Sequence, residues 1–114
     1  MDLRNIQLIA YDFDGVMTDN SVYLDEKGNE MVKVSRSDGL AISLIKNIGI
    51  DQIILSSENN PVVKKRAEKL SIECFYGVEN KAETFKKYIE TKNIKLNNVA
   101  FVGNDINDLE VMKI

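Results

Sequence analysis

The sequence predicts an α/β fold in which helices cover both faces of a central parallel sheet, a three-layer α/β/α arrangement. Short apolar runs that suit buried strands alternate along the chain with segments whose apolar residues recur at helical spacing. Polar residues follow these strands, as is typical of strand–helix connections. The 114 residues contain no linker, internal repeat or low-complexity stretch, so we expect one domain.

The N-terminal half is expected to supply a strand, a hairpin and a helix. The first strand covers residues 6–11, an almost continuous apolar run. Residues 21–25 and 30–35 alternate in polarity around a turn-rich centre and predict a protruding β-hairpin. A helix is predicted over 38–48, ending at Gly49. Its apolar face, which we expect to point inward, consists of Leu40, Leu44, Ile45 and Ile48.

Two strand–helix pairs are expected in the middle of the chain. Strand 50–55 leads into a helix that Asn60 caps and Pro61 opens. Strand 73–76 leads into a helix capped by Asn80, with Glu83 completing a variant of the capping box. The residues predicted to face the core are Val63, Ala67 and Leu70 in the first helix and Phe85, Tyr88 and Ile89 in the second.

The last predicted strand is 99–102, and a helix starts near Asp105 shortly before the sequence ends. An open sheet of this kind would normally cover its last helix or add a further strand. We therefore expect the chain to be truncated, or to be the ordered part of something longer.

Composition excludes several classes of function. The net charge of −3, with acidic and basic residues interleaved, argues against a nucleic-acid or membrane surface. The absence of histidine excludes His-activated nucleophiles and His metal sites. Cys74 is the one cysteine, so no intrachain disulfide can form and a cytoplasmic location fits. No apolar run approaches the ~20 residues of a membrane span, and nothing resembles a signal peptide.

The segment from Asp12 to Thr18 carries the strongest functional signal. Side chains two residues apart point the same way in an extended backbone, so Asp12 and Asp14 are expected to emerge together after the first strand. Two close carboxylates repel each other, and burial adds to the cost. A hard cation such as Mg²⁺ relieves this, because it prefers oxygen ligands. Gly15 allows a sharp turn beside the pair.

Polar residues also follow the other predicted strands, at the sheet edge where parallel sheets bind ligands. Ser56 follows strand 50–55, Lys81 follows strand 73–76, and residues 103–108 (GNDIND) follow strand 99–102. Together with DFDGVMT at 12–18, and in this order, they resemble the four motifs of the haloacid dehalogenase-like (HAD) superfamily over the whole chain. The resemblance implies a single Rossmann-like HAD core domain over residues 1–114.

The resemblance also implies a role for each residue. Asp12 would be the nucleophile that forms an aspartyl-phosphate, and Asp14 would protonate the leaving oxygen and then deprotonate the attacking water. Ser56 would donate a hydrogen bond to the phosphoryl group, and Lys81 would neutralise its charge. Taken singly, a serine after a strand is usually a loop residue or a cap, and a lysine in the first turn of a helix is usually solvated surface. Because all four motifs occur in the expected order along the chain, we favour a functional site over these separate explanations.

The metal would be Mg²⁺, bound by Asp12, by the backbone carbonyl of Asp14 and by the last loop. Most relatives have Asp where this chain has Asn104, so weaker metal binding is expected. Alternatively, Asp105 replaces it as the ligand, or Asp108 acts through neighbouring groups. Asp105 and Asp108 could also simply favour a helix dipole.

No cap domain fits in this sequence. Residues 18–56 have room only for the hairpin and one helix, and residues 57–81 only for one helix and a short strand. An open site would benefit from enclosure, so we expect neighbouring protomers to cover it in a homotetramer formed through the hairpin 21–35. Apolar residues on that hairpin would otherwise be exposed; they are Val22, Leu24, Met31 and Val34.

Among capless relatives, the chain resembles phosphatases of 3-deoxy-octulosonate (KDO) 8-phosphate and of nonulosonate (sialic-type) 9-phosphates. The likeness lies in residues 36–39, 77–78 and 102–105. The octulosonate phosphatases usually have Arg where this chain has Glu58. The pair of Glu58 and Lys69 instead resembles the phosphatases of the nine-carbon nonulosonates. The resemblance implies a sugar acid phosphate as substrate, bound by Arg36, Glu58 and Lys69, with the nonulosonate favoured. Glu58 and Lys69 could also be unrelated surface charges.

Residues 56–63 also resemble the phosphatase-like module of acylneuraminate cytidylyltransferases. A second hypothesis is therefore an oligomerisation module for such a partner enzyme.

Overall fold

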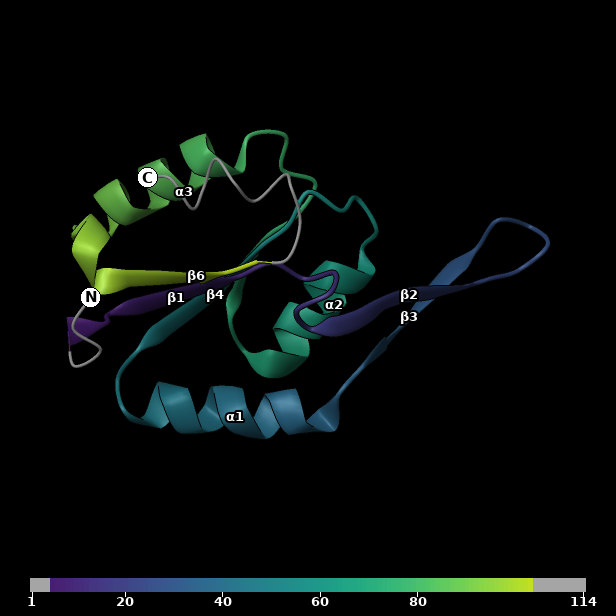
Figure 1. The fold of residues 1–114 in the computed structure, drawn as a ribbon, viewed down its shortest axis with the longest axis horizontal. Coiled ribbons are helices and arrows are strands. Elements are labelled where there is room, and N and C mark those ends of the chain that lie inside the picture. The colour runs from purple at the N-terminus through teal and green to yellow at the C-terminus, as the bar shows by residue number, and fades with distance from the viewer. Residues whose placement is uncertain (1–4, 104–114) are drawn as a thin grey trace.

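A central parallel sheet organises the computed structural model, which describes residues 5–103 (Figure 1). Its strands are β1 (Leu8–Tyr11), β4 (Asp51–Leu55), β5 (Glu73–Phe75) and β6 (Val99–Val102). Within the described residues the strand order is β5-β4-β1-β6, and every neighbouring pair is parallel. All four strands therefore end at one edge of the sheet.

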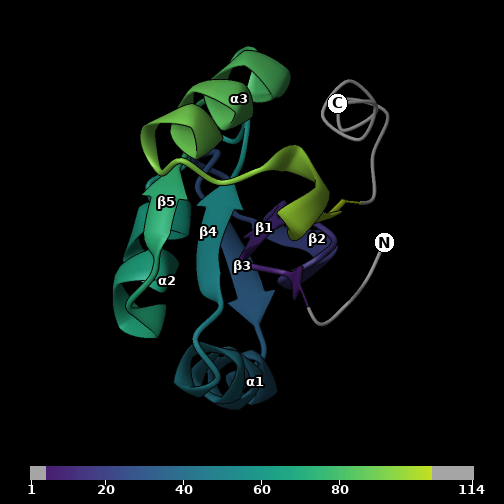
Figure 2. The same ribbon diagram turned by 90° about the vertical axis from the view of Figure 1, so that its left-hand side faces the viewer.

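Helices cover both faces of this sheet, as predicted. They are α1 (Arg36–Asn47), α2 (Val62–Leu70) and α3 (Lys81–Thr91), with a short 3₁₀ helix, η2 (Leu96–Asn98), before β6. In Figures 1 and 2, α3 lies on one side of the sheet and α1 and α2 lie on the other. The described residues thus form the predicted three-layer α/β/α arrangement, and they hold no cap domain.

Each face of the sheet has its own hydrophobic core. Because strand side chains alternate, Ile53 and Leu55 of β4 pack toward α3 with Phe85 and Ile89, whereas Ile54 packs toward α1 and α2. Burial on both faces explains why these strands are continuously apolar. The second core is completed by Phe13, Met17, Ile42, Val63, Ala67 and Leu70.

The inward face of α1 differs from the prediction. Leu40, Leu44 and Ile48 are 67%, 59% and 73% exposed, whereas Ile42 is buried. Ile45 is half-buried. Both faces of this helix have helical spacing, so periodicity alone did not distinguish them. The Ile42 side chain packs in the second core with Ile54 and Val63, and the Ile42 backbone carbonyl also accepts a hydrogen bond from Nε2 of buried Gln52, at 3.0 Å.

Asn80 is confirmed as the cap of α3, whereas the N-cap position of α2 is Pro61 and not Asn60 as predicted. Asn80 Oδ1 accepts a hydrogen bond from Glu83 N at 3.0 Å at the start of α3. Asn60 Oδ1 accepts one from Val62 N at 3.0 Å, although α2 itself begins after Pro61. Gly49, with φ +88°, follows the end of α1 as expected. The predicted helix near Asp105 lies outside the described residues.

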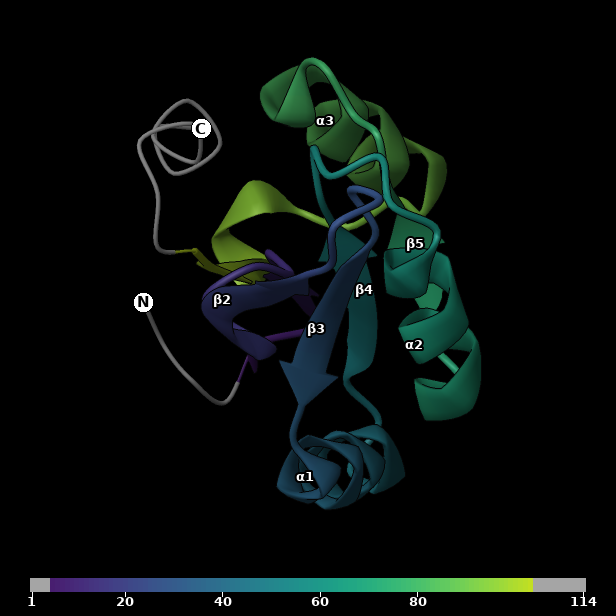
Figure 3. The same cartoon turned by 90° about the vertical axis from the view of Figure 1, so that its right-hand side faces the viewer.

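The hairpin extends away from the sheet as a separate antiparallel pair (Figures 1 and 3). Its strands are β2 (Thr18–Leu24) and β3 (Glu30–Val34), so β2 begins earlier than predicted. The register between them shifts between Thr18 and Val22, which marks a β-bulge at the base of the hairpin. Val34 packs against the core, contrary to its predicted place on an exposed arm. The base of the hairpin is therefore anchored beside the end of β1.

Candidate active site

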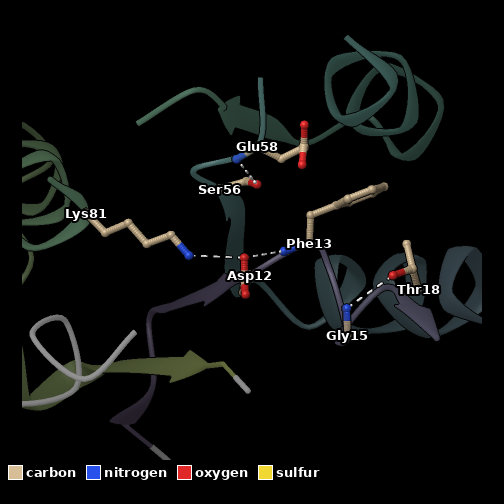
Figure 4. A network of polar contacts seen from close by, with 7 residues as sticks. All are labelled: Asp12, Phe13, Gly15, Thr18, Ser56, Glu58 and Lys81. Atoms are coloured by element: carbon tan, nitrogen blue, oxygen red, sulfur yellow. Dashed lines mark hydrogen bonds and ion pairs between the residues drawn. The ribbon is translucent and has the colours of Figure 1, made fainter. Parts of the chain in front are cut away.

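A buried ion pair lies at the C-terminal edge of the sheet. Lys81 Nζ and Asp12 Oδ1 are 3.1 Å apart, and the two side chains are 3% and 9% exposed (Figure 4). Asp12 follows β1, whereas Lys81 is the first residue of α3. Lys81 shares the buried face of α3 with Phe85 and Ile89, at i, i+4 and i+8. Helical geometry therefore directs the ammonium group toward Asp12.

A tight turn fixes the Asp12 carboxylate. Its Oδ1 atom also accepts a hydrogen bond from Phe13 N, at 2.8 Å. Phe13 is fully buried and its carbonyl accepts a hydrogen bond from Met17 N, at 2.8 Å. Gly15, with φ +78°, donates its N–H to Thr18 Oγ1 at 3.1 Å. The chain therefore turns sharply beside Asp12, as the sequence predicted.

Ser56 is buried at the end of β4, next to β1 in the sheet. Its Oγ atom accepts a hydrogen bond from Glu58 N at 3.1 Å (Figure 4). Two further backbone hydrogen bonds tie this loop to the one before α3: Val78 N donates to Ser56 O at 3.0 Å, and Gly77 N donates to Glu58 O at 2.8 Å. The same loop pair thus positions both Ser56 and the start of the helix that carries Lys81.

Asp14 lies half-buried beside a cavity of about 160 Å³. Burial raises the pKa of the Asp14 carboxyl, and the carboxylates of Glu58 and Glu30 raise it further, whereas Lys81 lowers it. A raised pKa suits a group that must hold a proton before giving it to a leaving oxygen. Asp12 and Asp14 therefore have different surroundings, one beside a cation and the other beside carboxylates.

Comparison with known proteins agrees with this geometry. No family model matches the chain. It is 33% identical over 111 residues to 3-deoxy-D-manno-octulosonate 8-phosphate phosphatase KdsC of Escherichia coli, covering 96% of this chain and 59% of that protein. A solved structure from Streptomyces avermitilis, assigned to the HAD family hydrolases, superposes with a TM-score of 0.94 at 40% identity, covering 99% of this chain and 65% of that one.

In sequence and in fold, the chain is similar to hydrolases of the HAD superfamily. A further HAD-like neighbour is the 3-deoxy-D-manno-octulosonate 8-phosphate phosphatase of Moraxella catarrhalis, solved with magnesium, phosphate and KDO. It has a TM-score of 0.88 at 28% identity, covering 95% of this chain and 63% of that one. The chain thus spans about three fifths of the length of the curated relatives it matches.

Four of the predicted site residues lie at this edge of the sheet: Asp12, Asp14, Ser56 and Lys81. Glu58 joins them, since it lines the cavity beside Asp14. Arg36 and Lys69 are exposed on α1 and α2, and neither lines that cavity. Their role in substrate binding stays a prediction. The predicted metal ligands Asn104, Asp105 and Asp108 lie outside the described residues.

Sequence reasoning missed part of this cavity. Asn20 and Glu30 from the hairpin line it, together with Asn60. The bulge that places Asn20 there has no strong sequence signal, although a positive φ of 64° is tolerated better by Asn than by most residues. The hairpin therefore contributes to the site within one protomer, in addition to its predicted role in assembly.

Proposed function

We propose that this protein is a Mg²⁺-dependent phosphatase of the HAD superfamily that hydrolyses a phosphorylated 2-keto-3-deoxy sugar acid through an aspartyl-phosphate. The buried pair of Lys81 and Asp12 carries the proposal. Burying an ion pair is costly, and replacing it by apolar residues would often stabilise a fold. Its presence at the ligand-binding edge of a parallel sheet, beside Ser56, therefore favours a chemical role.

The proposed reaction has two steps. A carboxylate oxygen of Asp12 bonds to phosphorus while the ester P–O bond breaks, and Asp14 gives its proton to the leaving alcohol oxygen. Asp14 then accepts a proton from water as that water attacks phosphorus, the bond to Asp12 breaks and inorganic phosphate leaves. Lys81 and Ser56 stabilise the charge on the equatorial phosphoryl oxygens in both steps.

The donors at this edge suit Mg²⁺, because carboxylate and carbonyl oxygens are the ligands it prefers. Asp12 and Asp14 would hold it, with the remaining ligands predicted from residues 104–108. Within residues 5–103, no cluster of three or more acidic or cysteine side chains is arranged to hold a metal. When bound, the ion would neutralise charge on the phosphoryl group and the acids around it.

The substrate class follows from the KdsC-like relatives and from Glu58. A KDO 8-phosphate and a nonulosonate 9-phosphate share a keto acid at one end and a phosphate ester at the other. Glu58 stands where the octulosonate enzymes usually have Arg, and its carboxylate acts on Asp14. We therefore favour the nine-carbon substrate, with the eight-carbon one as the alternative.

The hairpin is proposed to join protomers into a homotetramer. Its apolar side chains Val22, Tyr23, Leu24 and Met31 are each more than half exposed. Part of the outer face of α1 is apolar as well. No helix in the described part of the chain is long and apolar enough to cross a membrane. The cytoplasmic location stays a prediction.

The test is phosphate release from a panel of sugar acid phosphates in the presence of Mg²⁺, with KDO 8-phosphate and a nonulosonate 9-phosphate side by side. Asp12→Asn should lower kcat at least about 100-fold. Asp51→Asn, at the opposite edge of the sheet, is the matched control and should retain activity. Equal release by wild type and Asp12→Asn would remove Asp12 from the mechanism. Release from neither substrate, with tetramers present, would favour the oligomerisation module.

A further inference from the structure

We infer that the cavity beside Asp14 binds the uncharged, hydroxyl-bearing carbons next to the phosphate ester, and that Glu30 excludes substrates with a carboxylate at that position. This inference rests on the proposed phosphatase function and names the part of the substrate that the cavity selects. The cavity holds about 160 Å³ and opens beside the residue proposed to protonate the leaving oxygen. The atoms bonded to that oxygen must therefore lie at or in this cavity.

Three segments build the cavity. The turn after β1 supplies Asp14, the hairpin supplies residues of β2 and β3, and the loop before α2 supplies the rest (Figure 1). Its lining combines polar side chains with three valines, which suit contact with the carbon atoms of a substrate. The described lining residues are Asp14, Asn20, Val22, Glu30, Val32, Glu58, Asn60 and Val62.

The polar groups of this lining suit alcohols. A hydroxyl both donates and accepts, so it can give its hydrogen to a carboxylate and receive one from an amide N–H₂. Glu58 and Asn60 are held in place: Glu58 Oε1 accepts from Asn60 N, and Asn60 Oδ1 accepts from Val62 N, each at 3.0 Å. The Asn60 carboxamide therefore keeps its N–H₂ group available as a donor.

The hairpin contributes Asn20 through an irregular backbone. Asn20 has φ +64°, its N–H bonds Thr18 Oγ1 at 3.1 Å, and the β2–β3 register shifts around it. A bulge changes the direction in which a strand's side chains point and is common beside active sites. Here it gives the cavity a second carboxamide in addition to that of Asn60.

Charge explains what the cavity would reject. Of its eight described lining residues, three are acidic and none is basic. Lys81, the cation near Asp14, is paired with Asp12. A substrate carboxylate placed here would face the exposed Glu30 and the half-buried Glu58, and like charges at short range near a protein surface repel each other. A sugar acid phosphorylated at its far end avoids this, because hydroxylated carbons separate its carboxylate from the ester.

A matched pair of substrates tests the inference. Glycerol 3-phosphate and 3-phosphoglycerate differ only in a terminal hydroxymethyl group and a carboxylate. The wild type should prefer glycerol 3-phosphate by about tenfold or more in kcat/KM. Glu30→Gln should reduce that ratio at least about threefold, mainly by faster turnover of 3-phosphoglycerate, and Glu30→Lys should reduce it further. Glu26→Gln, the same change at an exposed hairpin position outside the cavity, should leave the ratio unchanged.

Two controls separate this inference from the proposed function. Absence of p-nitrophenyl phosphate hydrolysis would refute the proposed phosphatase activity. If the protein does hydrolyse it, a ratio of kcat/KM for glycerol 3-phosphate to that for 3-phosphoglycerate near one would refute the role of the cavity. A ratio that Glu30→Gln and Glu26→Gln change equally would refute that role as well. Binding to the Asp12→Asn variant needs no turnover. Glycerol 3-phosphate should shift the side-chain amide NMR signals of Asn20 and Asn60, and unchanged signals at saturating ligand would also overturn the inference.

Discussion

Replacing Lys81 by Met should destabilise the protein far more than the same change at Lys87 in the same helix. Lys81 Nζ is 3.1 Å from Asp12 Oδ1, and both side chains are almost fully buried. Met has a similar length, so the change removes the charge with little loss of packing. It leaves Asp12 buried without its cation, which costs about 3–5 kcal/mol in comparable pairs. Because Asp12 can take up a proton, we expect the lower end, about 3 kcal/mol.

Lys87 provides the matched control. Its Nζ lies 2.9 Å from Glu83 Oε1, a shorter distance, but the two side chains are 73% and 58% exposed. Exposed i,i+4 pairs contribute about 0.3–0.5 kcal/mol, so Lys87→Met should cost less than 1 kcal/mol.

Urea unfolding followed by circular dichroism measures both free energies of unfolding. The double variant Asp12→Asn/Lys81→Met should be more stable than Lys81→Met alone, because it removes the buried carboxylate charge together with the ammonium group. Equal costs for Lys81→Met and Lys87→Met would refute the reasoning, since the Asp12–Lys81 pair would then behave as an exposed one.

Three further predictions concern the scaffold. Gly77→Ala and Gly28→Ala should each cost about 1 kcal/mol in urea unfolding, because both residues have positive φ. The added Cβ at Gly77 would lie 2.8 Å from Asn59 Oδ1, but that atom ends an exposed side chain that can turn away, so the two costs should be similar; a loss at Gly77 several times larger would contradict this. Gln52→Leu should lower the free energy of unfolding by about 1–3 kcal/mol despite adding an apolar side chain, because Tyr11 Oη and Ile42 O each lose a hydrogen-bond partner. A thermal denaturation midpoint at or above that of the wild type would contradict this. Burial raises the pKa of the Cys74 thiol to about 11, so the rate of alkylation by iodoacetamide should be low at pH 8 and should rise toward pH 11. In urea the rate should rise near the ordinary thiol pKa. Identical pH profiles in the folded and unfolded states would show that burial has no effect.

Local sequence signals predicted most of the sheet and most helix ends. The apolar runs at 8–11, 51–55 and 99–102 are strands because both faces of the sheet are covered, and the caps at Asn80 and Gly49 lie where expected. Asp12 and Lys81 form an ion pair at the edge where the parallel strands end, and Ser56 lies at the end of the neighbouring strand. Lys81 carries a signal of its own, since it continues the buried stripe of Phe85 and Ile89.

Tertiary arrangement decided what the sequence left open. The inward face of α1 depends on where Gln52 and α2 lie, and two faces of that helix have apolar spacing. The contribution of Asn20 and Glu30 to the site depends on where the base of the hairpin lies relative to Asp14. A register shift of two residues between Thr18 and Val22 lies at this base, and neither strand pattern nor turn composition locates it.

The central claim is that Asp12, held by Lys81, accepts the phosphoryl group. Mass spectrometry of protein quenched in acid during turnover of a sugar acid phosphate tests it most directly. We predict a phosphorylated peptide that carries the added phosphoryl group on Asp12 and that disappears in the Asp12→Asn variant. Steady phosphate release with no phosphoryl group on Asp12 at any quench time would contradict the account.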